Sequence, residues 1–248
     1  MLPAARLSLP ELIIFDKDGT LIEFHAMWSG WLEGLAARLA AGAGRTLAAD
    51  YLSHAGYDAA ARRTLPGGRL ARLSMADFYA HGIEFLTEHG VADPERVMAA
   101  AWSIPDPVHT AHPITDLDAL FSLLRAHGCR LAVATSDDHG PAEATLAHLG
   151  VLRHLEGILG ADDGLPIKPA PDMVLHFCRL TAVAPARALV VGDSQEDLRM
   201  ARAAGAAAVG VLTGITSAAQ LAPLADHVLD GVDQLPALLG LYLPSRAT

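Results

Sequence analysis

Short apolar runs recur along the chain and predict its strands. The first of them is followed directly by Asp16, and the polar residues Thr135 and Asp193 stand at or just beyond the ends of two others. An uninterrupted apolar run of this length is typical of a strand that is buried on both faces in a parallel sheet. We therefore expect strands over five segments, namely 12–15, 131–134, 188–191, 207–211 and 227–229.

The residues between these runs show helical spacing. Helices are predicted over 141–149, 172–180 and 195–204, the last of them closed by Gly205. Strands that alternate with helices predict a doubly wound, Rossmann-like α/β fold with a mostly parallel sheet. In such sheets ligands bind beyond the carboxyl ends of the strands, which is where the distinctive polar residues of this chain occur.

One long segment departs from this alternation. Between residues 23 and 107 the apolar positions recur at three-to-four spacing without clear strand runs, as in the helix expected to start near Phe24. Further helices are expected at 48–55, 75–89 and 94–102. We therefore predict an α/β core made of residues 1–22 and 108–248, into which an all-helical cap of residues 23–107 is inserted.

Composition limits the classes of partner. The chain has 248 residues and a formal net charge of -10, which disfavours binding to nucleic acid or to anionic lipid. Its two cysteines, Cys129 and Cys178, are too few for a disulfide framework, and its first residues are too short and proline-broken for a signal peptide or membrane span. We expect a cytoplasmic monomer or homodimer that acts on a small molecule.

The first candidate site follows the first predicted strand. Asp16 and Asp18 are two residues apart, and Gly19 allows a tight turn directly after them. Paired carboxylates suit metal binding, or a nucleophile beside a general acid and base. A calcium loop is excluded because Leu21 and Met27 stand where such a loop needs glycine and glutamate. A plain solvated turn remains the alternative for this motif alone.

Further candidates follow other predicted strands and one loop. Thr135 and Ser136 offer hydroxyl and backbone N–H groups that can hold phosphate oxygens, although a simple turn would use the same residues. Lys168 lies in a proline-rich loop, and it is one of only two lysines in the chain, Lys17 being the other. Because the chain otherwise uses arginine, a lysine at this position favours a functional role for a compact positive charge. The alternative is a lysine that is simply exposed on the surface.

The last candidates are Asp193 and Asp197. They lie one helical turn apart, after a predicted strand and at the start of a predicted helix, so both can face one site. The alternative is helix capping, with Asp193 or Ser194 as the N-cap and Asp197 favouring the helix dipole. Capping and metal binding are compatible at this position.

These four motifs, in this order, resemble those of the haloacid dehalogenase superfamily of phosphohydrolases, over nearly the whole chain. The resemblance implies Asp16 as nucleophile, Asp18 as general acid and base, and Thr135, Ser136 and Lys168 as phosphate ligands. It implies Mg²⁺ held by Asp16, the Asp18 carbonyl and Asp193, with Asp197 behind them. The helical insert would be a mobile cap that closes over the substrate and excludes water.

Within the superfamily the chain is similar to phosphoglycolate phosphatases and their relatives. It departs from them at Glu23 and Phe24, where an Asp-Ser pair is common, and at Ser136, where asparagine is common. These departures concern the substrate and leave the phosphoryl chemistry in place. The resemblance therefore implies a Mg²⁺-dependent phosphatase of a small phosphorylated metabolite, with a β-phosphoglucomutase-like phosphomutase or a noncatalytic metabolite-binding protein as alternatives.

The insert carries a few residues that can meet a leaving group. Cationic or amphipathic candidates there are His25, Trp28, Arg62, Arg63 and Arg69. Trp28 lies on the apolar helix face, which favours a place in the core, and the paired arginines favour an exposed helix face. A pair of histidines, His109 and His112, has metal-like spacing but no third ligand nearby, so we interpret both as loop residues.

Overall fold

Six parallel strands form one sheet in the computed structural model of the protein. The structure describes residues 7–65, 67–103 and 111–241, and at 25–27 and 71–72 it describes only the backbone. Their order across the sheet is β5-β4-β1-β6-β7-β8. The five predicted strands are confirmed, while β5 was not predicted, because half-exposed positions interrupt its apolar pattern. The strands are β1 (Leu12–Phe15), β4 (Arg130–Ala134), β5 (Leu155–Leu159), β6 (Ala188–Gly192), β7 (Ala207–Val211) and β8 (His227–Leu229).

The sheet has a switch point beside its first strand. From β1 the chain builds β4 and β5 on one side, and then crosses back to add β6, β7 and β8 on the other. Phe15 at the end of β1 is paired with Val133 on β4 and with Val191 on β6. The residues that follow these strands therefore emerge together at one edge of the sheet, where doubly wound folds bind their ligands.

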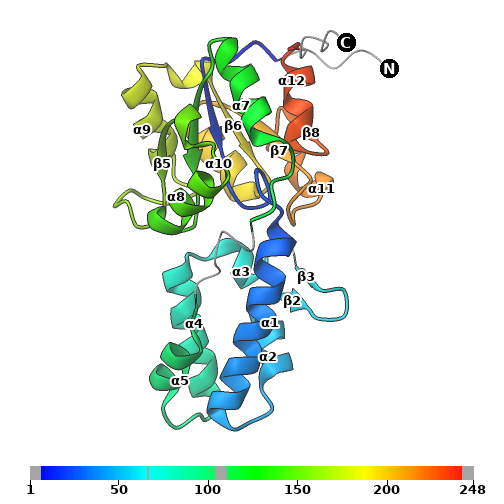
Figure 1. Ribbon diagram of the computed structural model, residues 1–248, viewed down its shortest axis with the longest axis vertical. Coiled ribbons are helices and arrows are strands. Elements are labelled where there is room, and N and C mark those ends of the chain that lie inside the picture. The colour runs from blue at the N-terminus through cyan, green and yellow to red at the C-terminus, as the bar shows by residue number, and fades with distance from the viewer. Residues whose placement is uncertain (1–6, 66, 104–110, 242–248) are drawn as a thin grey trace.

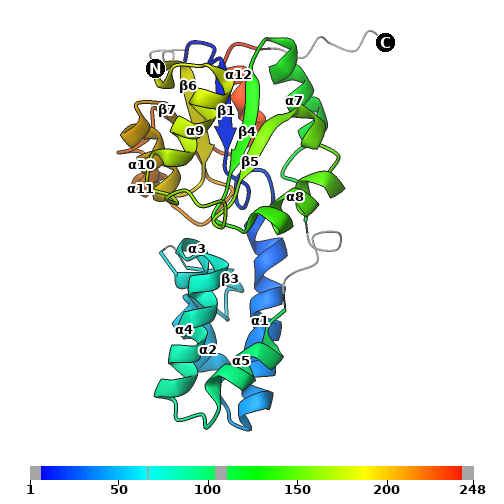
Figure 2. The same cartoon turned by 90° about the vertical axis from the view of Figure 1, so that its left-hand side faces the viewer.

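Helices cover both faces of the sheet, which confirms the doubly wound fold (Figures 1 and 2). Ile13 and Phe15 on one face pack with α7 (Leu117–Ala126), α8 (His139–His148) and α12 (Leu235–Leu238). Leu12 and Ile14 on the other face pack with α9 (Asp172–Thr181), α10 (Gln195–Ala204) and α11 (Ala218–Leu221). This alternation of faces follows from the two-residue period of a strand. Short 3₁₀ helices occur at η1 (Leu152–His154), η2 (Pro185–Arg187) and η3 (Val232–Gln234).

A second group of helices lies beyond the carboxyl edge of the sheet, around its own hydrophobic core (Figure 1). The predicted helical insert is present, with one correction to the term all-helical. A short antiparallel hairpin interrupts the helices, and its strands of 2 residues each are too short to show a two-residue period. The elements are α1 (Phe24–Ala43), α2 (Ala48–Ala55), β2 (Tyr57–Asp58), β3 (Arg63–Thr64), α3 (Arg69–Arg72), α4 (Met75–Glu88) and α5 (Pro94–Ala101).

The chain leaves the sheet and returns to it side by side. The Glu23 N–H donates to the His112 carbonyl at 2.9 Å, and the Ile114 N–H donates to the Leu21 carbonyl at 3.0 Å. The expected boundary between residues 107 and 108 falls outside the described residues, so the division into core and cap stays a prediction. Among the helices that the structure describes, none combines the length and apolarity needed to cross a membrane.

Candidate active site

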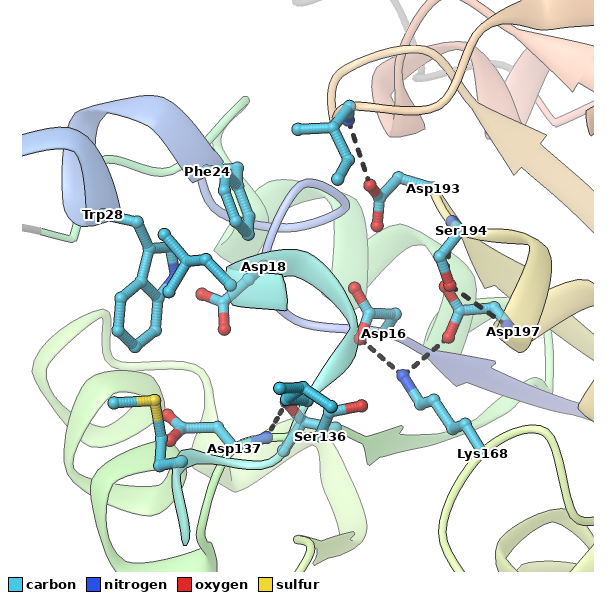
Figure 3. Close-up of a pocket in the computed structure, with 15 residues that line it drawn as sticks. Asp16, Asp18, Phe24, Trp28, Ser136, Asp137, Lys168, Asp193, Ser194 and Asp197 are labelled. Atoms are coloured by element: carbon cyan, nitrogen blue, oxygen red, sulfur yellow. Dashed lines mark hydrogen bonds and ion pairs between the residues drawn. The ribbon is translucent and has the colours of Figure 1, made fainter. Parts of the chain in front are cut away.

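A cavity lies between the carboxyl edge of the sheet and the helical insert (Figure 3). Its floor is polar and comes from the loops after β1, β4 and β6 and from the loop that carries Lys168. Its roof is apolar and comes mainly from the insert. The site residues predicted from the four motifs all line this cavity, so the fold brings together Asp16, Asp18, Thr135, Ser136, Lys168, Asp193 and Asp197.

Asp16 is fixed at the end of the central strand. Its N–H donates to the Val191 carbonyl at 2.9 Å, which continues the pairing of β1 with β6 beyond the last strand residue. One carboxylate oxygen, Oδ1, accepts a hydrogen bond from Lys168 Nζ at 2.6 Å. Burial raises the pKa of Asp16 to about 7, although the positive charge of Lys168 partly offsets this rise. The side chain is therefore a buried carboxylate that faces the cavity beside an ammonium group.

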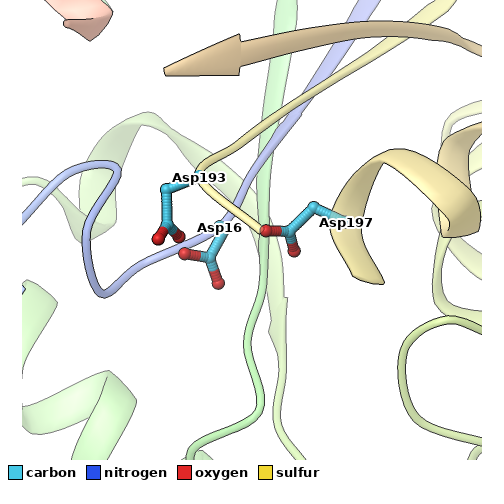
Figure 4. A group of neighbouring side chains, drawn as sticks. All are labelled: Asp16, Asp193 and Asp197. Carbon is cyan, nitrogen blue, oxygen red and sulfur yellow. The ribbon is translucent and has the colours of Figure 1, made fainter. Parts of the chain in front are cut away.

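Three buried carboxylates converge beside this position (Figure 4). One oxygen each from Asp16, Asp193 and Asp197 lies within 4.8 Å of the other two. Burial raises the pKa of Asp193, and the negative charges of Asp16 and Asp197 raise it further. Like charges held this close call for a cation, and oxygen-only ligands are those that a hard divalent cation prefers. These residues therefore fit a divalent metal ion.

Lys168 connects two of these carboxylates. Its Nζ lies 2.6 Å from Asp16 Oδ1 and 2.6 Å from Asp197 Oδ1, so the side chain is a buried ion-paired group and not a surface lysine. Burial alone would lower the pKa of Lys168, but the two carboxylates outweigh that effect and raise it. The floor therefore keeps a permanent positive charge that can face a phosphate group.

Thr135 and Ser136 face the same cavity from the end of β4. The Thr135 hydroxyl is buried and accepts a hydrogen bond from the Asp137 N–H at 3.1 Å. Accepting this bond leaves the hydroxyl hydrogen available for donation to a ligand oxygen. Ser136 is partly exposed on the cavity wall. Both residues therefore offer hydroxyl groups to the cavity, and their role as phosphate ligands stays a prediction.

Lys17 forms a buried ion-paired group that sequence reasoning did not assign. Its Nζ lies 2.7 Å from both carboxylate oxygens of Asp18 and 3.3 Å from Asp137 Oδ2. Burial opposes the charge of Lys17, but Asp18 and Asp137 outweigh it and raise its pKa. The available signal was the scarcity of lysine together with the position of Lys17 between two aspartates. Asp137 would be an unfavourable neighbour for a bound phosphate. The ion pair holds its carboxylate against the positive charge of Lys17.

The capping alternative is correct, with Ser194 as the N-cap, and it coexists with the site. Asp197 Oδ2 accepts hydrogen bonds from the N–H and the hydroxyl of Ser194 at 3.1 and 2.6 Å, while the Ser194 hydroxyl caps the Asp197 N–H at 3.2 Å. This capping box starts α10. Asp197 Oδ1 meanwhile pairs with Lys168. The helix start therefore orients Asp197, and Asp197 in turn positions Lys168.

The loop that follows β7 is a further part of the site that the sequence reasoning missed. Thr213 Oγ1 donates to the Gly19 carbonyl at 2.6 Å, and the Ile215 N–H donates to Asp193 Oδ2 at 3.3 Å. Between them, Gly214 lies so close to Asp193 that a Cβ atom built there would be 1.7 Å from Oδ2. The signal that could have found this loop is a threonine and a glycine just past a predicted strand.

Replacing Gly214 with alanine is expected to displace Asp193 and to lower activity by about 10²-fold, since small misplacements of site groups are costly. The added methyl group is also expected to cost about 1–3 kcal/mol of stability through overpacking. Phosphate release and urea denaturation measure the two effects. The matched control is Gly140→Ala, whose Cβ would meet no described atom within 4 Å other than those of its own stretch of helix. Equal activity and equal stability of the two variants would contradict the close contact between Gly214 and Asp193.

The carboxylate cluster also predicts a pH dependence in the presence of a chelator. Folded Asp16 holds a proton up to about pH 7, while the unfolded chain releases it near the ordinary value of 3.8, and Asp193 shifts in the same direction. The free energy of unfolding should therefore fall as the pH rises through this window. Urea midpoints at about pH 5 and about pH 7.5 in EDTA measure the fall. A midpoint that rises with pH, or that changes equally in Asp16→Asn, would contradict this prediction.

The candidates in the insert have different outcomes. Trp28 packs in the insert core as expected, and it also lines the cavity, which the apolar pattern did not indicate. Arg62 pairs with Glu33 at 2.8 Å, and Arg69 donates to the His54 carbonyl, each outside the cavity lining. Arg63 lines a separate depression beside the 212–218 loop. The side chain of His25 and all of His109 lie outside what the structure describes, and His112 is exposed in a loop.

Comparisons with known proteins agree with this geometry. Residues 10–205 match the haloacid dehalogenase-like hydrolase family. A phosphoglycolate phosphatase of Rhodospirillum rubrum is 32% identical over 240 residues, which cover 95% of this chain and 93% of that protein. A fructose-1-phosphate phosphatase of Escherichia coli is 30% identical over 203 residues, covering 80% of this chain and 95% of that protein.

The fold also agrees with solved structures. A haloacid dehalogenase family hydrolase of Deinococcus radiodurans, solved with bound phosphate and sodium, superposes with a TM-score of 0.65 at 21% identity, covering 96% of this chain and 100% of that one. This likeness shows the shared fold, and the sequence matches show the shared family. The protein is therefore a member of the haloacid dehalogenase-like hydrolase family.

Proposed function

We propose that the protein is a Mg²⁺-dependent phosphatase that hydrolyses small phosphomonoesters through an aspartyl-phosphate on Asp16. The observation that carries this proposal is the arrangement of the floor, where the buried Asp16 carboxylate lies between Lys168, the Asp193–Asp197 pair and the carboxylate of Asp18. A nucleophile, a fixed cation and a second acid in one cavity are the groups that phosphoryl transfer requires. A module that only binds a metabolite needs no second acid of this kind.

In the first step an Asp16 oxygen forms a bond to phosphorus while the bond from phosphorus to the ester oxygen breaks. Protonated Asp18 gives its proton to the leaving oxygen, which departs as a neutral alcohol. In the second step the Asp18 carboxylate takes a proton from water as the water oxygen attacks phosphorus, which releases Asp16 and phosphate. Lys168, Thr135 and Ser136 hold the phosphoryl oxygens throughout.

The metal would be held by the carboxylates of Asp16 and Asp193 and by the main-chain carbonyl of Asp18. When bound, Mg²⁺ neutralises negative charge on the phosphoryl group and on the carboxylates that face it. Asp197 supports this set indirectly, since its Oδ1 pairs with Lys168 and its Oδ2 caps α10. The excess of buried carboxylates over ammonium groups is the feature of this chain that fits the ion.

Phosphate release from a panel of esters, with Mg²⁺ or with EDTA, tests the proposal. The panel includes phosphoglycolate and fructose 1-phosphate, for which the two relatives are named. Release that requires Mg²⁺ is the expected result. Conversion of a sugar phosphate to its isomer without free phosphate would instead support the phosphomutase, and binding without turnover would support a noncatalytic protein.

A further inference from the structure

The roof of the cavity differs from its floor in having no charge among the described side chains. Its members come from the start of α1, from α3 and the turn that leads into the start of α4, and from the loop after β7. They are Phe24, Trp28, Leu70, Leu73, Met75 and Ile215. A leaving group bound to a phosphate on the floor would meet these apolar side chains.

The described cations near the roof are either paired or, like Arg63, line a separate depression. Lys168 pairs with carboxylates on the floor, and Lys17 is buried beneath Asp18. Arg62 is paired with Glu33, and Arg69 donates to a main-chain carbonyl away from the cavity. Within the described part of the chain, therefore, no cation faces the space that a leaving group would occupy. A carboxylate placed there would lose its hydration without gaining a partner, which is costly.

One polar atom interrupts the roof. Trp28 is 6% exposed, and its Nε1 has no hydrogen-bond partner among the residues that the structure describes. Its ring is held against Trp31, edge to face at a centroid distance of 5.4 Å, and Figure 3 places it on the same side of the cavity as Asp18. A buried indole N–H ordinarily finds an acceptor, so this unpaired donor indicates a ligand oxygen.

We propose that the preferred substrate is a phosphomonoester whose leaving group is uncharged, has an apolar or ring-shaped body, and carries one oxygen that accepts a hydrogen bond from Trp28. This inference rests on the proposed phosphatase function and names the substrate class of the same site. It separates this chain from its relatives named for phosphoglycolate, because the leaving group of that ester carries a carboxylate.

Three matched esters test the roof. Benzyl phosphate, para-carboxybenzyl phosphate and para-(hydroxymethyl)benzyl phosphate share the same reacting oxygen and differ only at the far end of the ring. With Mg²⁺ present, kcat/KM is expected to be at least about tenfold lower for the carboxylated ester than for benzyl phosphate, because a carboxylate would be buried without a partner. The hydroxymethyl ester should be the best of the three.

Two variants assign the effect to named residues. Leu73→Arg places a cation in the roof, and it should raise the ratio of kcat/KM for the carboxylated ester over benzyl phosphate by about tenfold or more. Trp28→Phe keeps an aromatic ring but removes the N–H, and it should lower the ratio for the hydroxymethyl ester over benzyl phosphate by about fivefold. If either variant fails to fold, the kcat/KM values of the three esters on the unmodified protein still test the proposed substrate preference.

The outcomes separate the two proposals. Phosphate release that requires Asp16, together with a carboxylated ester or phosphoglycolate as the best substrate, would overturn the inference and leave the phosphatase standing. Release from none of the esters, and from no member of the wider panel, would overturn the phosphatase and the inference together. Metal-dependent release that favours the uncharged esters supports both.

Discussion

Replacing Asp16 with asparagine is expected to reduce phosphate release by about 10⁴-fold or more, because a carboxamide is a very poor nucleophile toward phosphorus. The shape of the side chain is kept, so substrate and metal sites change little in size. Release of phosphate from the best ester of the panel, measured with Mg²⁺ in excess, gives the effect. Retained turnover would contradict the assignment of Asp16.

The same substitution is expected to stabilise the protein when no metal is bound. Asp16 is buried beside Asp197 and Asp18, and its raised pKa shows that its ionised form is unfavourable in the fold. Removing that charge should raise the melting temperature above neutral pH in EDTA by roughly 5 °C. The matched control is Asp50→Asn, in which an exposed carboxylate at the start of α2 is replaced. A loss of both activity and stability would indicate a structural role for Asp16 instead.

Replacing Lys17 with methionine is expected to cost about 3–5 kcal/mol of stability, because it leaves the buried Asp137 and the partly buried Asp18 carboxylates without their cation. Methionine preserves most of the volume of the side chain, so the loss reports charge more than packing. Lys17 lies 2.7 Å from Asp18 and 3.3 Å from Asp137, and it is fully buried. Urea denaturation near neutral pH measures the change.

A surface ion pair provides the control for this variant. Arg125 lies 3.0 Å from Glu156 and is partly exposed, so Arg125→Met should cost only about 0–1 kcal/mol. The double variant Lys17→Met/Asp137→Asn should recover part of the loss, since one of the two unpaired charges is then removed. Equal losses of stability in Lys17→Met and Arg125→Met would contradict the assignment of Lys17 as a buried ion-paired group.

The sheet and most helices were predictable because each is encoded locally. A strand such as β1 is buried on both faces, so its residues are apolar without interruption, and the alternation with helices follows from the same signal. The edge strand β5 and the hairpin of β2 and β3 lack that signal, because one is half exposed and the other is very short. Whether such elements form depends on contacts with distant parts of the chain, which the local sequence pattern does not show.

The site shows the same division. Asp16, Thr135 and Asp193 were predictable because the carboxyl ends of parallel strands meet at one edge. The pairing of Lys17 with Asp137 depends instead on the path of two loops that are far apart in sequence. The contact of Gly214 with Asp193 depends on the path of another loop, the one after β7. Trp28 was named as a candidate but assigned to the core, and the structure shows that a residue on an apolar helix face can belong to a core and to a cavity at once.

The paired connections between sheet and insert have an evolutionary consequence. Because Glu23 is hydrogen-bonded to His112, and Leu21 to Ile114, the two ends of the insert are neighbours at a single point of attachment. A different segment of any size can be accommodated there if its own ends lie close together, without disturbing the strands below. The residues of the floor can thus be inherited unchanged while the part of the roof that the insert supplies is exchanged as one contiguous stretch of gene.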